Sequence, residues 1–230
     1  MPLPSVIAID GPAASGKTTV GRALAQRLGY RFLDTGLMYR TATLMALRRG
    51  VPLDDPAALG SLADGLRLDV VVARNGGGEA VLADGEDVTA ELRTAAVDDA
   101  VSLVAQVSAV RRAMVVQQQR MASEGGIVMV GRDIGTRVLP SAMKVFLDAT
   151  PEERARRRFL EQRERSASTT MEEVRTNLEL RDRLDSERAD SPLRAAPDAT
   201  LIDTEGLGPA DVVQRIVDCA KVRGPEVHGQ

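Results

Sequence analysis

The stretch that decides the fold is "SVIAIDGPAASGKTTV", residues 5–20. The apolar run at 5–10 is typical of a buried strand, and apolar residues recur at helical spacing over 17–29. Between them, residues 11–18 fit the pattern G-x-x-x-x-G-K-[ST], in which two glycines let the backbone curl until several N–H groups point at phosphate oxygens. The stretch therefore predicts a phosphate-binding loop between a strand and a helix.

The side chains of this loop suit a nucleoside triphosphate. Lys17 can reach the β- and γ-phosphates, and the hydroxyl of Thr18 can bind Mg²⁺ directly or through water. The loop N–H groups lie at a helix N-terminus, whose partial positive charge favours an anion. We therefore expect ATP as co-substrate, Mg²⁺ as cofactor and Thr18 as the metal ligand. The residues expected to bind ATP are Gly11, Pro12, Ala13, Ala14, Ser15, Gly16, Lys17, Thr18 and Thr19.

The rest of the chain repeats the alternation of apolar strand and helix. Near-continuous apolar strands that alternate with helices indicate a parallel sheet covered on both faces. We predict an α/β fold, with a P-loop NTPase-type core, a small antiparallel insert and a helical lid in one domain of residues 1–230. The further strands are expected at 30–36, 126–130, 144–148 and 199–203, and helices at 17–29, 37–50 and 94–122.

The segment 66–93 departs from this alternation. Its apolar residues recur every second position, and Asn75-Gly76 and Asp84-Gly85 are turn signals. The pattern predicts a small antiparallel meander inserted into the α/β core.

The lid is expected at 150–170. Thr150 can cap a helix, Pro151 suits the first helical position and Glu153 completes a capping box. The polar stretch 166–170 then interrupts the helix before a second capped helix over 171–188. Two arginine-rich helices joined by small residues are typical of a lid.

Composition excludes several classes of protein. The net charge of −3 and the scarcity of aromatic residues argue against binding to a nucleic acid polymer. Cys219 is expected to pack in the core, and His228, the one histidine, lies in a tail that we expect to be disordered. Catalytic triads and His/Cys zinc sites are therefore excluded. With no signal peptide or membrane-spanning run in the sequence, we expect a cytoplasmic protein.

Three further motifs place charged side chains at strand ends or on one helix face. "LDTGLMYR" contains Asp34, Thr35, Tyr39 and Arg40 where a predicted strand gives way to a helix, the edge at which doubly wound sheets bind ligands. The second motif, "GRDIGT" at 131–136, puts Arg132 beside Asp133 directly after a buried strand. In "RDRLDSER" the spacing puts Arg181, Asp185 and Arg188 on one helix face, where the carboxylate can hold both arginines. A solvent-exposed ion-pair face explains that last spacing equally well.

The scarcity of histidine favours a phosphate over a hydroxyl as the acceptor. A phosphate monoester is largely ionised near neutral pH, so its phosphorylation needs positioning and charge neutralisation more than a base. A GTPase is disfavoured because no N-K-x-D motif is present. Three alternatives remain open. They are a kinase for another nucleoside monophosphate, a kinase for a small-molecule hydroxyl with Asp34 or Asp133 as base, and a nucleotide-binding regulator without turnover.

With these motifs assembled, the chain resembles the bacterial cytidylate kinases of the nucleoside monophosphate kinase family. The resemblance runs from residue 6 to residue 204 through "IAIDGPAASGKTTV", "FLDTGLMYR", "GEDVTAELRT", "VGRDIGTRVLP", "VFLDATPEERARRR" and "RDRLDSERADSPLRAAPDATLIDT". The antiparallel insert at 66–93 also resembles the one that marks this family. The resemblance implies Mg²⁺-dependent transfer of the γ-phosphoryl group of ATP to CMP or dCMP. Separately, we expect the protein to be a monomer.

The resemblance also implies roles for individual residues. Those expected at the acceptor nucleotide are Arg40, Arg132 and Arg188 at the phosphate, Arg181 and Asp185 at the ribose, Ser102, Arg111 and Asp133 at the cytosine, and Thr35 and Tyr39 beside them. Those expected to take part in phosphoryl transfer are Lys17, Arg132, Arg188 and the lid residues Arg154, Arg157 and Arg158.

Overall fold

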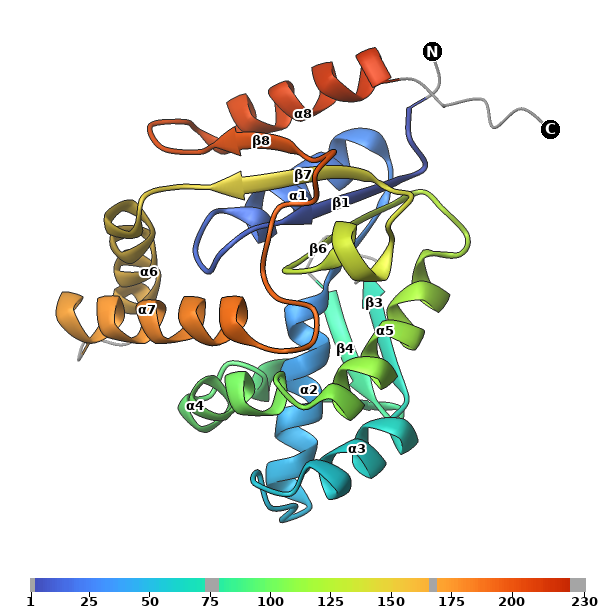
Figure 1. Cartoon of the computed structure of the whole chain (residues 1–230), viewed down its shortest axis with the longest axis vertical. Coiled ribbons are helices and arrows are strands. Elements are labelled where there is room, and N and C mark those ends of the chain that lie inside the picture. Colours follow the sequence, from blue (N-terminus) through green and yellow to red (C-terminus); the bar gives the residue numbers. More distant parts are fainter. Residues whose placement is uncertain (1–2, 73–78, 166–168, 224–230) are drawn as a thin grey trace. The chain divides into compact units, whose positions relative to one another are not determined.

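The computed structural model describes residues 3–72, 79–165 and 169–223 (Figure 1). The chain divides into two compact units, one of residues 1–33 and 124–230 and the other of residues 34–123. The first unit contains the phosphate loop and the second contains the antiparallel strands. Assignment of the whole chain to one domain, and of 150–170 to a lid, stays a prediction.

The first unit is built on a five-stranded sheet in the order β2-β6-β1-β7-β8. The pairs β1–β6, β1–β7 and β7–β8 are parallel, so the carboxyl ends of these strands share one edge of the sheet. Each predicted apolar strand is present, which confirms the α/β fold. The strands are β1 (Val6–Asp10), β2 (Arg31–Asp34), β6 (Ile127–Gly131), β7 (Met143–Asp148) and β8 (Thr200–Asp203).

One face of this sheet is covered by α1 (Lys17–Leu28) and α8 (Pro209–Arg223), which lie next to each other. Ile7 and Ile9 alternate along β1 and both face this core, as the period of two in a strand requires. Cys219 on α8 packs against the same cluster, which confirms the core position predicted for this thiol. His228 lies outside the described residues.

Two helices follow β7 and contact each other, α6 (Pro151–Arg165) and α7 (Met171–Glu187). The backbone N–H of Glu153 donates to the hydroxyl of Thr150 at 3.4 Å, and α7 begins with a complete capping box between Thr170 and Glu173. Both predicted N-termini are therefore capped, but the carboxylate of Glu153 pairs with Arg156 and Arg157 instead of completing the capping box predicted at Thr150. Most of the connecting stretch, 166–168, lies outside the described residues.

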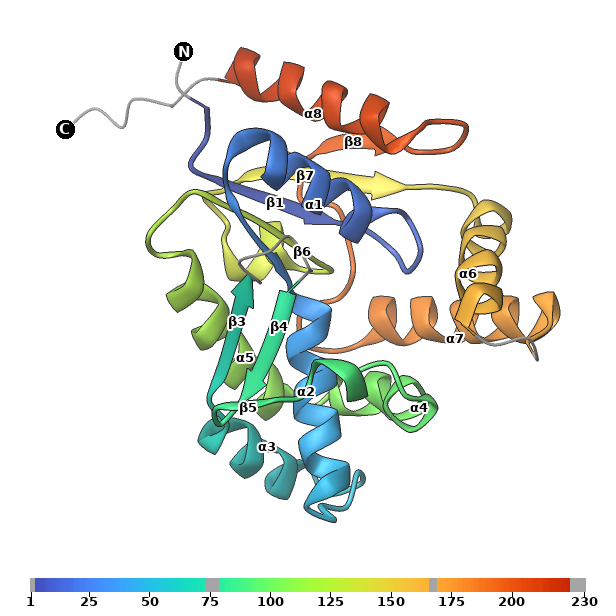
Figure 2. The same cartoon turned by 180° about the vertical axis from the view of Figure 1, so that it is seen from behind.

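The second unit combines a three-stranded antiparallel sheet with four helices (Figure 2). At the turn between β4 and β5, Asp84 and Gly85 both have positive φ, 51° and 90°, the geometry of a tight hairpin. The other predicted turn, Asn75-Gly76, lies outside the described residues. The elements are α2 (Thr35–Arg48), α3 (Pro56–Gly65), β3 (Leu68–Val72), β4 (Glu79–Ala83), β5 (Glu86–Asp87), the 3₁₀ turn η1 (Thr89–Glu91), α4 (Ala95–Val104) and α5 (Ser108–Ala122).

Three features differ from the expectations. The helix expected over 94–122 is interrupted at 105–107, and α3 was not expected. A short π-helix, η2 (Ile134–Val138), follows β6 and contacts β1, β6 and β7. Among the described residues, no helix is long and apolar enough to cross a membrane.

Candidate active site

The phosphate loop owes its shape to close backbone packing. A Cβ on Gly11 would lie 2.1 Å from the carbonyl oxygen of Leu147 on β7, so only glycine fits there. Gly16 has φ of 92°, a left-handed conformation that also favours glycine. These two glycines let the chain turn from β1 into α1. The N–H groups at the start of α1 are then available to a phosphate bound in the loop.

Lys17, the first residue of α1, is buried and reaches back across this loop. Its Nζ donates to the carbonyl oxygen of Pro12 at 2.5 Å and to Oγ of Ser15 at 3.3 Å. The ammonium group therefore lies within the turn of backbone that is expected to hold phosphate. Thr18 is half-buried beside it, and Thr19 is exposed.

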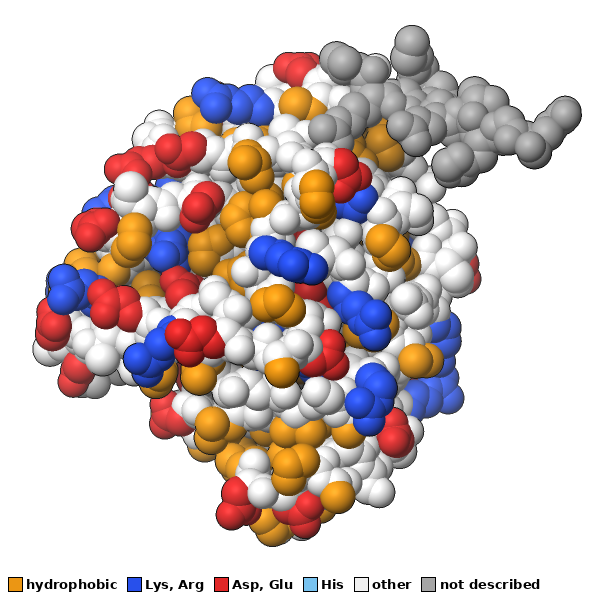
Figure 3. Space-filling view, viewed as in Figure 1, with side chains coloured by type: hydrophobic (Ala, Val, Ile, Leu, Met, Phe, Trp, Pro, Cys, Tyr) orange, Lys and Arg blue, Asp and Glu red, His pale blue; other side chains and the backbone are white. Residues whose placement is uncertain are grey.

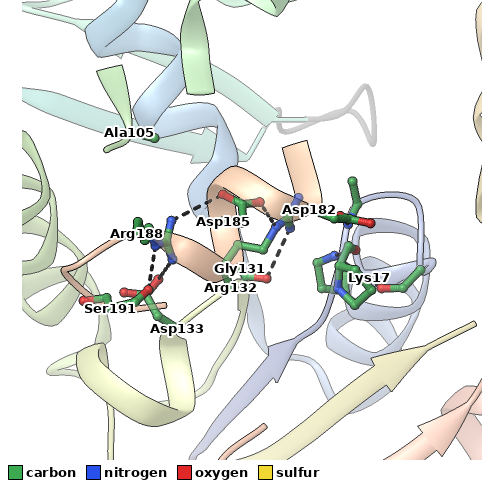
Figure 4. Close-up of polar contacts among 12 residues, drawn as sticks. Lys17, Ala105, Gly131, Arg132, Asp133, Asp182, Asp185, Arg188 and Ser191 are labelled. Carbon is green, nitrogen blue, oxygen red and sulfur yellow. Dashed lines mark hydrogen bonds and ion pairs between the residues drawn. The ribbon is translucent and has the colours of Figure 1, made fainter. Parts of the chain in front are cut away.

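Arg132 and Asp133 lie next to the phosphate loop because of the pairing between β1 and β6. In this register Asp10, the residue before Gly11, is opposite Gly131, the residue before Arg132. Nε of Arg132 donates to Oδ2 of Asp185 on α7 at 2.9 Å (Figure 4). Two of the predicted acceptor residues are thus joined across the sheet edge.

Arg188 follows α7 directly and is the second arginine held at this edge. Nη1 of Arg188 lies 3.4 Å from Oδ1 of Asp185, and Nη2 lies 3.7 Å from Oδ1 of Asp133. Nε donates to the backbone oxygen of Ser191 at 2.6 Å, which fixes the plane of the guanidinium group (Figure 4). Arg132, Asp133, Asp185 and Arg188 therefore form one charged cluster.

Asp185 is held ionised within this cluster. Burial alone raises the pKa of its carboxyl, but the charges of the neighbouring arginines and the hydrogen bond from Arg132 together outweigh burial, so the pKa lies below its usual value. Arg181, on the same helix face, also lowers this pKa through its charge. The spacing predicted that Asp185 would pair with Arg181 and Arg188. The pair with Arg188 is present. Asp185 also pairs with Arg132, which the spacing did not predict.

The three predicted lid arginines have different surroundings. Arg154 is buried and donates to the backbone oxygens of Ala13 and Ala149 and to the carboxylate of Asp182. Arg157 donates to Thr204 and to Glu153. Arg154 thus contacts the phosphate loop itself.

Arg158 lies further along α6 and pairs with Glu161 at 3.0 Å. Other basic side chains on α6 and α7 also pair with acidic neighbours. At the left of Figure 3, where these helices lie, basic and acidic side chains are intermixed. Arg156 with Glu153 and Arg175 with Glu172 are examples.

In the second unit, the predicted residues fall into two contacts. Arg40 donates to the backbone oxygen of Leu92 at 2.9 Å and to the carboxylate of Asp98 at 2.5 Å. The guanidinium of Arg111 lies over the ring of Tyr39, 5.3 Å from its centroid, in a cation–π contact.

Thr35 and Ser102 are the other two predicted residues of this unit. Thr35 is the buried first residue of α2, and Ser102 is half-buried on α4. The roles of both residues at the acceptor nucleotide stay predictions.

Two carboxylates of the first unit were missed by the sequence reasoning. Asp10 accepts the backbone N–H groups of Ile134 and Gly135. Asp182 accepts the N–H of Ala13 at 3.3 Å and pairs with Arg154. A signal for Asp10 was present, since a charged residue at the end of an apolar strand needs a partner, but its partner is 124 residues away.

With these contacts established, the chain can be compared with known proteins. The family model described as "Cytidylate kinase" matches residues 7–222. The chain belongs to the cytidylate kinase family. Curated members are similar over nearly their whole length: the cytidylate kinase of Geobacillus kaustophilus (strain HTA426) is 49% identical over 94% of this chain and 96% of its own. The cytidylate kinase of Bacillus licheniformis is 46% identical over 92% and 93%.

The core also resembles that of another kinase of known structure. Shikimate kinase from Bacteroides thetaiotaomicron is 14% identical, covers 94% of this chain and 98% of its own, and superimposes with a TM-score of 0.50. At this identity the likeness concerns the fold alone. It agrees with the P-loop core predicted from residues 5–20.

Proposed function

We propose that the chain transfers the γ-phosphoryl group of ATP to CMP or dCMP, giving ADP and CDP or dCDP. The observation that carries this proposal is the cluster of Arg132, Asp133, Asp185 and Arg188, which lies at the same sheet edge as the phosphate loop. A phosphate-binding loop explains the donor, and the cluster supplies paired cations for an acceptor phosphate. Membership of the cytidylate kinase family supports the same assignment.

The chemistry of the cluster suits a cytidine monophosphate. Arg132 and Arg188 are each oriented by Asp185, so little side-chain freedom is lost when their other N–H groups bind phosphate oxygens. The carboxylate of Asp133 matches the exocyclic amine of cytosine, which is a hydrogen-bond donor.

The remaining roles come from the family resemblance, and we propose them for the same nucleotide. Arg111 is suited to donate to O2 or N3 of cytosine, both of which are acceptors. The other proposed contacts are Arg40 at the phosphate, Arg181 and Asp185 at the ribose, Ser102 at the base, and Thr35 and Tyr39 alongside.

Phosphoryl transfer itself calls for positioning and charge neutralisation. The transferred group carries negative charge in the transition state, and we propose that Lys17, whose Nζ lies within the phosphate loop, stabilises it. We propose that Arg154, Arg157 and Arg158 assist, as lid residues of the family do. Because an acceptor monoester is already ionised, this chain needs no histidine base.

Mg²⁺ is the proposed cofactor, and the residues of the loop fit it. The hydroxyl of Thr18 is a hard oxygen ligand at the second position of α1, beside Lys17. Among the described residues, no group of three or more His, Cys, Asp and Glu could hold a metal, so phosphate and water oxygens are the expected remaining ligands. The ion would neutralise charge on the β- and γ-phosphates.

The proposal is tested with a panel of acceptors. In a coupled assay for ADP, turnover with CMP and dCMP should exceed turnover with UMP and AMP. Equal rates with all four nucleotides would contradict the proposed cytosine specificity. The competing function, a kinase for a small-molecule hydroxyl with Asp34 or Asp133 as base, requires CMP to be inert.

We also propose that the protein acts as a cytoplasmic monomer. One chain supplies the phosphate loop and the paired arginines, so a second copy is not required for chemistry. Light scattering of the purified protein tests this, and a mass twice that of the chain would contradict it.

A further inference from the structure

Asp10 is a buried carboxylate with a defined pair of partners. It ends β1 and is 5% exposed. Its Oδ1 accepts the N–H of Ile134 at 2.9 Å, and its Oδ2 accepts the N–H of Gly135 at 2.7 Å. Each carboxylate oxygen therefore holds one N–H group of the turn that follows Arg132 and Asp133.

These two N–H groups are the ones that a helix start leaves without an intrahelical partner. Ile134 and Gly135 are the first residues of η2, whose own hydrogen bonds begin with Arg137 and Val138 donating to the backbone oxygen of Asp133. Asp10 thus acts as an N-cap supplied by a distant strand.

This arrangement frees the residue that would ordinarily do the capping. Asp133 occupies the N-cap position of η2, yet its side chain makes no capping hydrogen bond. Instead its carboxylate lies 3.7 Å from Nη2 of Arg188 (Figure 4). The task of capping and the task of facing the charged cluster are therefore divided between two carboxylates.

We propose that Asp10 is a positioning residue for the acceptor nucleotide, whose carboxylate fixes the 134–135 turn and so directs Arg132 and Asp133 towards CMP. This inference rests on the proposed CMP kinase activity. It requires a carboxylate, because an asparagine has one acceptor oxygen and would present its NH₂ group to the second N–H.

Several charged groups surround Asp10 and must be considered in any pH experiment. The charge of Asp133 after β6 disfavours ionisation of Asp10, and the charge of Lys17 at the start of α1 favours it. Lys144 of β7 packs its side chain against Gly135 and pairs with Asp198 at 2.5 Å. Burial has the largest effect and raises the pKa of Asp10 to about 6, so the carboxylate form prevails at pH 7.5.

The test is the kinetics of Asp10→Asn with each substrate varied separately. We expect KM for CMP to rise about tenfold and KM for ATP to change less than about twofold, since the phosphate loop keeps its own backbone contacts. An unchanged KM for CMP, or an equal rise in both constants, would overturn the proposal. A wild-type enzyme inert towards CMP would instead refute the proposed function, so the two failures are distinguishable.

A matched control is available in the second unit. Asp55 also accepts two successive backbone N–H groups, those of Ala57 and Ala58, but it is exposed and caps α3. Asp55→Asn should leave both KM values unchanged. A rise in KM for CMP in this control would mean that loss of any backbone cap produces the effect, which would overturn a specific role for Asp10.

The pH dependence of KM for CMP distinguishes a positioning role of Asp10 from a purely structural one, because a purely structural role would not change it. The ratio of KM for CMP between Asp10→Asn and wild type should fall towards one as the pH drops from 8 to 5.5, because protonated Asp10 resembles asparagine. The phosphate monoester of CMP titrates near pH 6 as well, but it affects both enzymes equally and cancels in the ratio. A ratio independent of pH would contradict the proposal.

A second variant tests the turn if Asp10→Asn does not fold. A Cβ on Gly135 would lie 2.9 Å from Cγ of Lys144 and 3.4 Å from Oδ2 of Asp10, so Gly135→Ala displaces the same turn with the carboxylate intact. We expect a selective rise in KM for CMP here too. A folded Gly135→Ala enzyme with wild-type KM for CMP would overturn the inference.

Discussion

Lys17 carries the most direct prediction at the scale of the residue. It is buried in the phosphate loop, with Nζ bonded to Pro12 and Ser15. Lys17→Ala should lower kcat by about 10²–10³, the usual effect of removing one group that stabilises transition-state charge. Lys221→Ala, at an exposed pair on α8, is the control and should be silent. A Lys17→Ala enzyme within threefold of wild type would contradict the assigned role.

The raised pKa of Asp10 should make the stability of the protein depend on pH. Burial raises its pKa from 3.8 to about 6, so between these values the folded protein holds a proton that the unfolded chain has lost. The free energy of unfolding of the wild type should therefore fall, relative to that of Asp10→Asn, by about 2 kcal/mol as the pH rises from 4 to 7. Urea denaturation of both proteins across this range measures the difference. Parallel stability curves would show that the pKa of Asp10 is not raised.

The sequence predicted which residues form the site better than it predicted which residues they pair with. Lys17 and Thr18 were identified because a short contiguous motif fixes their surroundings. The partner of Arg132 was not, because Asp185 is 53 positions away and meets it only when α7 packs at the sheet edge. Asp10 was missed for the same reason, since the β1–β6 register decides what lies opposite it.

At the scale of the element, α6 and α7 are attached to the phosphate loop. Ala13 packs in a small apolar cluster with Ala155 of α6 and with Val174 and Leu178 of α7. Asp182 reinforces this packing by accepting the N–H of Ala13 and pairing with Arg154. The first turns of the proposed lid are therefore anchored to the donor side.

This attachment predicts a kinetic effect opposite to that of Asp10. Asp182→Asn breaks a half-buried ion pair and should raise KM for ATP about fivefold with a smaller change for CMP. Glu172→Gln removes an exposed pair on the same helix and serves as the control. Kinetics with each substrate varied in turn measure the split, and a larger effect on CMP than on ATP would contradict it.

Elements with local signals were predicted well, and those set by packing were not. The second lid helix begins with a cap, as expected, and Thr170 and Glu173 supply it because both lie within one turn. The interruption at 105–107 and the π-helix η2 carry no comparable signal. The start of α3 did carry a local signal, Asp55 followed by Pro56. Asp55 caps the helix and Pro56 occupies its first position.

At the scale of the whole molecule, the fold follows from the parallel strands and the phosphate loop. Residues 5–20 predicted the core, and the family model and the curated relatives cover more than nine-tenths of the chain. The division into two units at 33/34 and 123/124 was not predicted, because the expected insert covered only 66–93. The second unit is compact because α2 contacts α3, α4 and α5. Hydrophobic periodicity within a single segment does not predict contacts between segments.

One measurement tests the central claim most directly. With limiting ATP and equal concentrations of CMP, dCMP, UMP and AMP in one reaction, the product ratios report relative kcat/KM for the four acceptors. Anion-exchange chromatography should show that CDP and dCDP far exceed UDP and that their sum nearly equals the ADP formed, because phosphorylation of AMP would add further ADP. Formation of UDP in amounts equal to CDP, or ATP consumption without any cytidine diphosphate, would contradict the account.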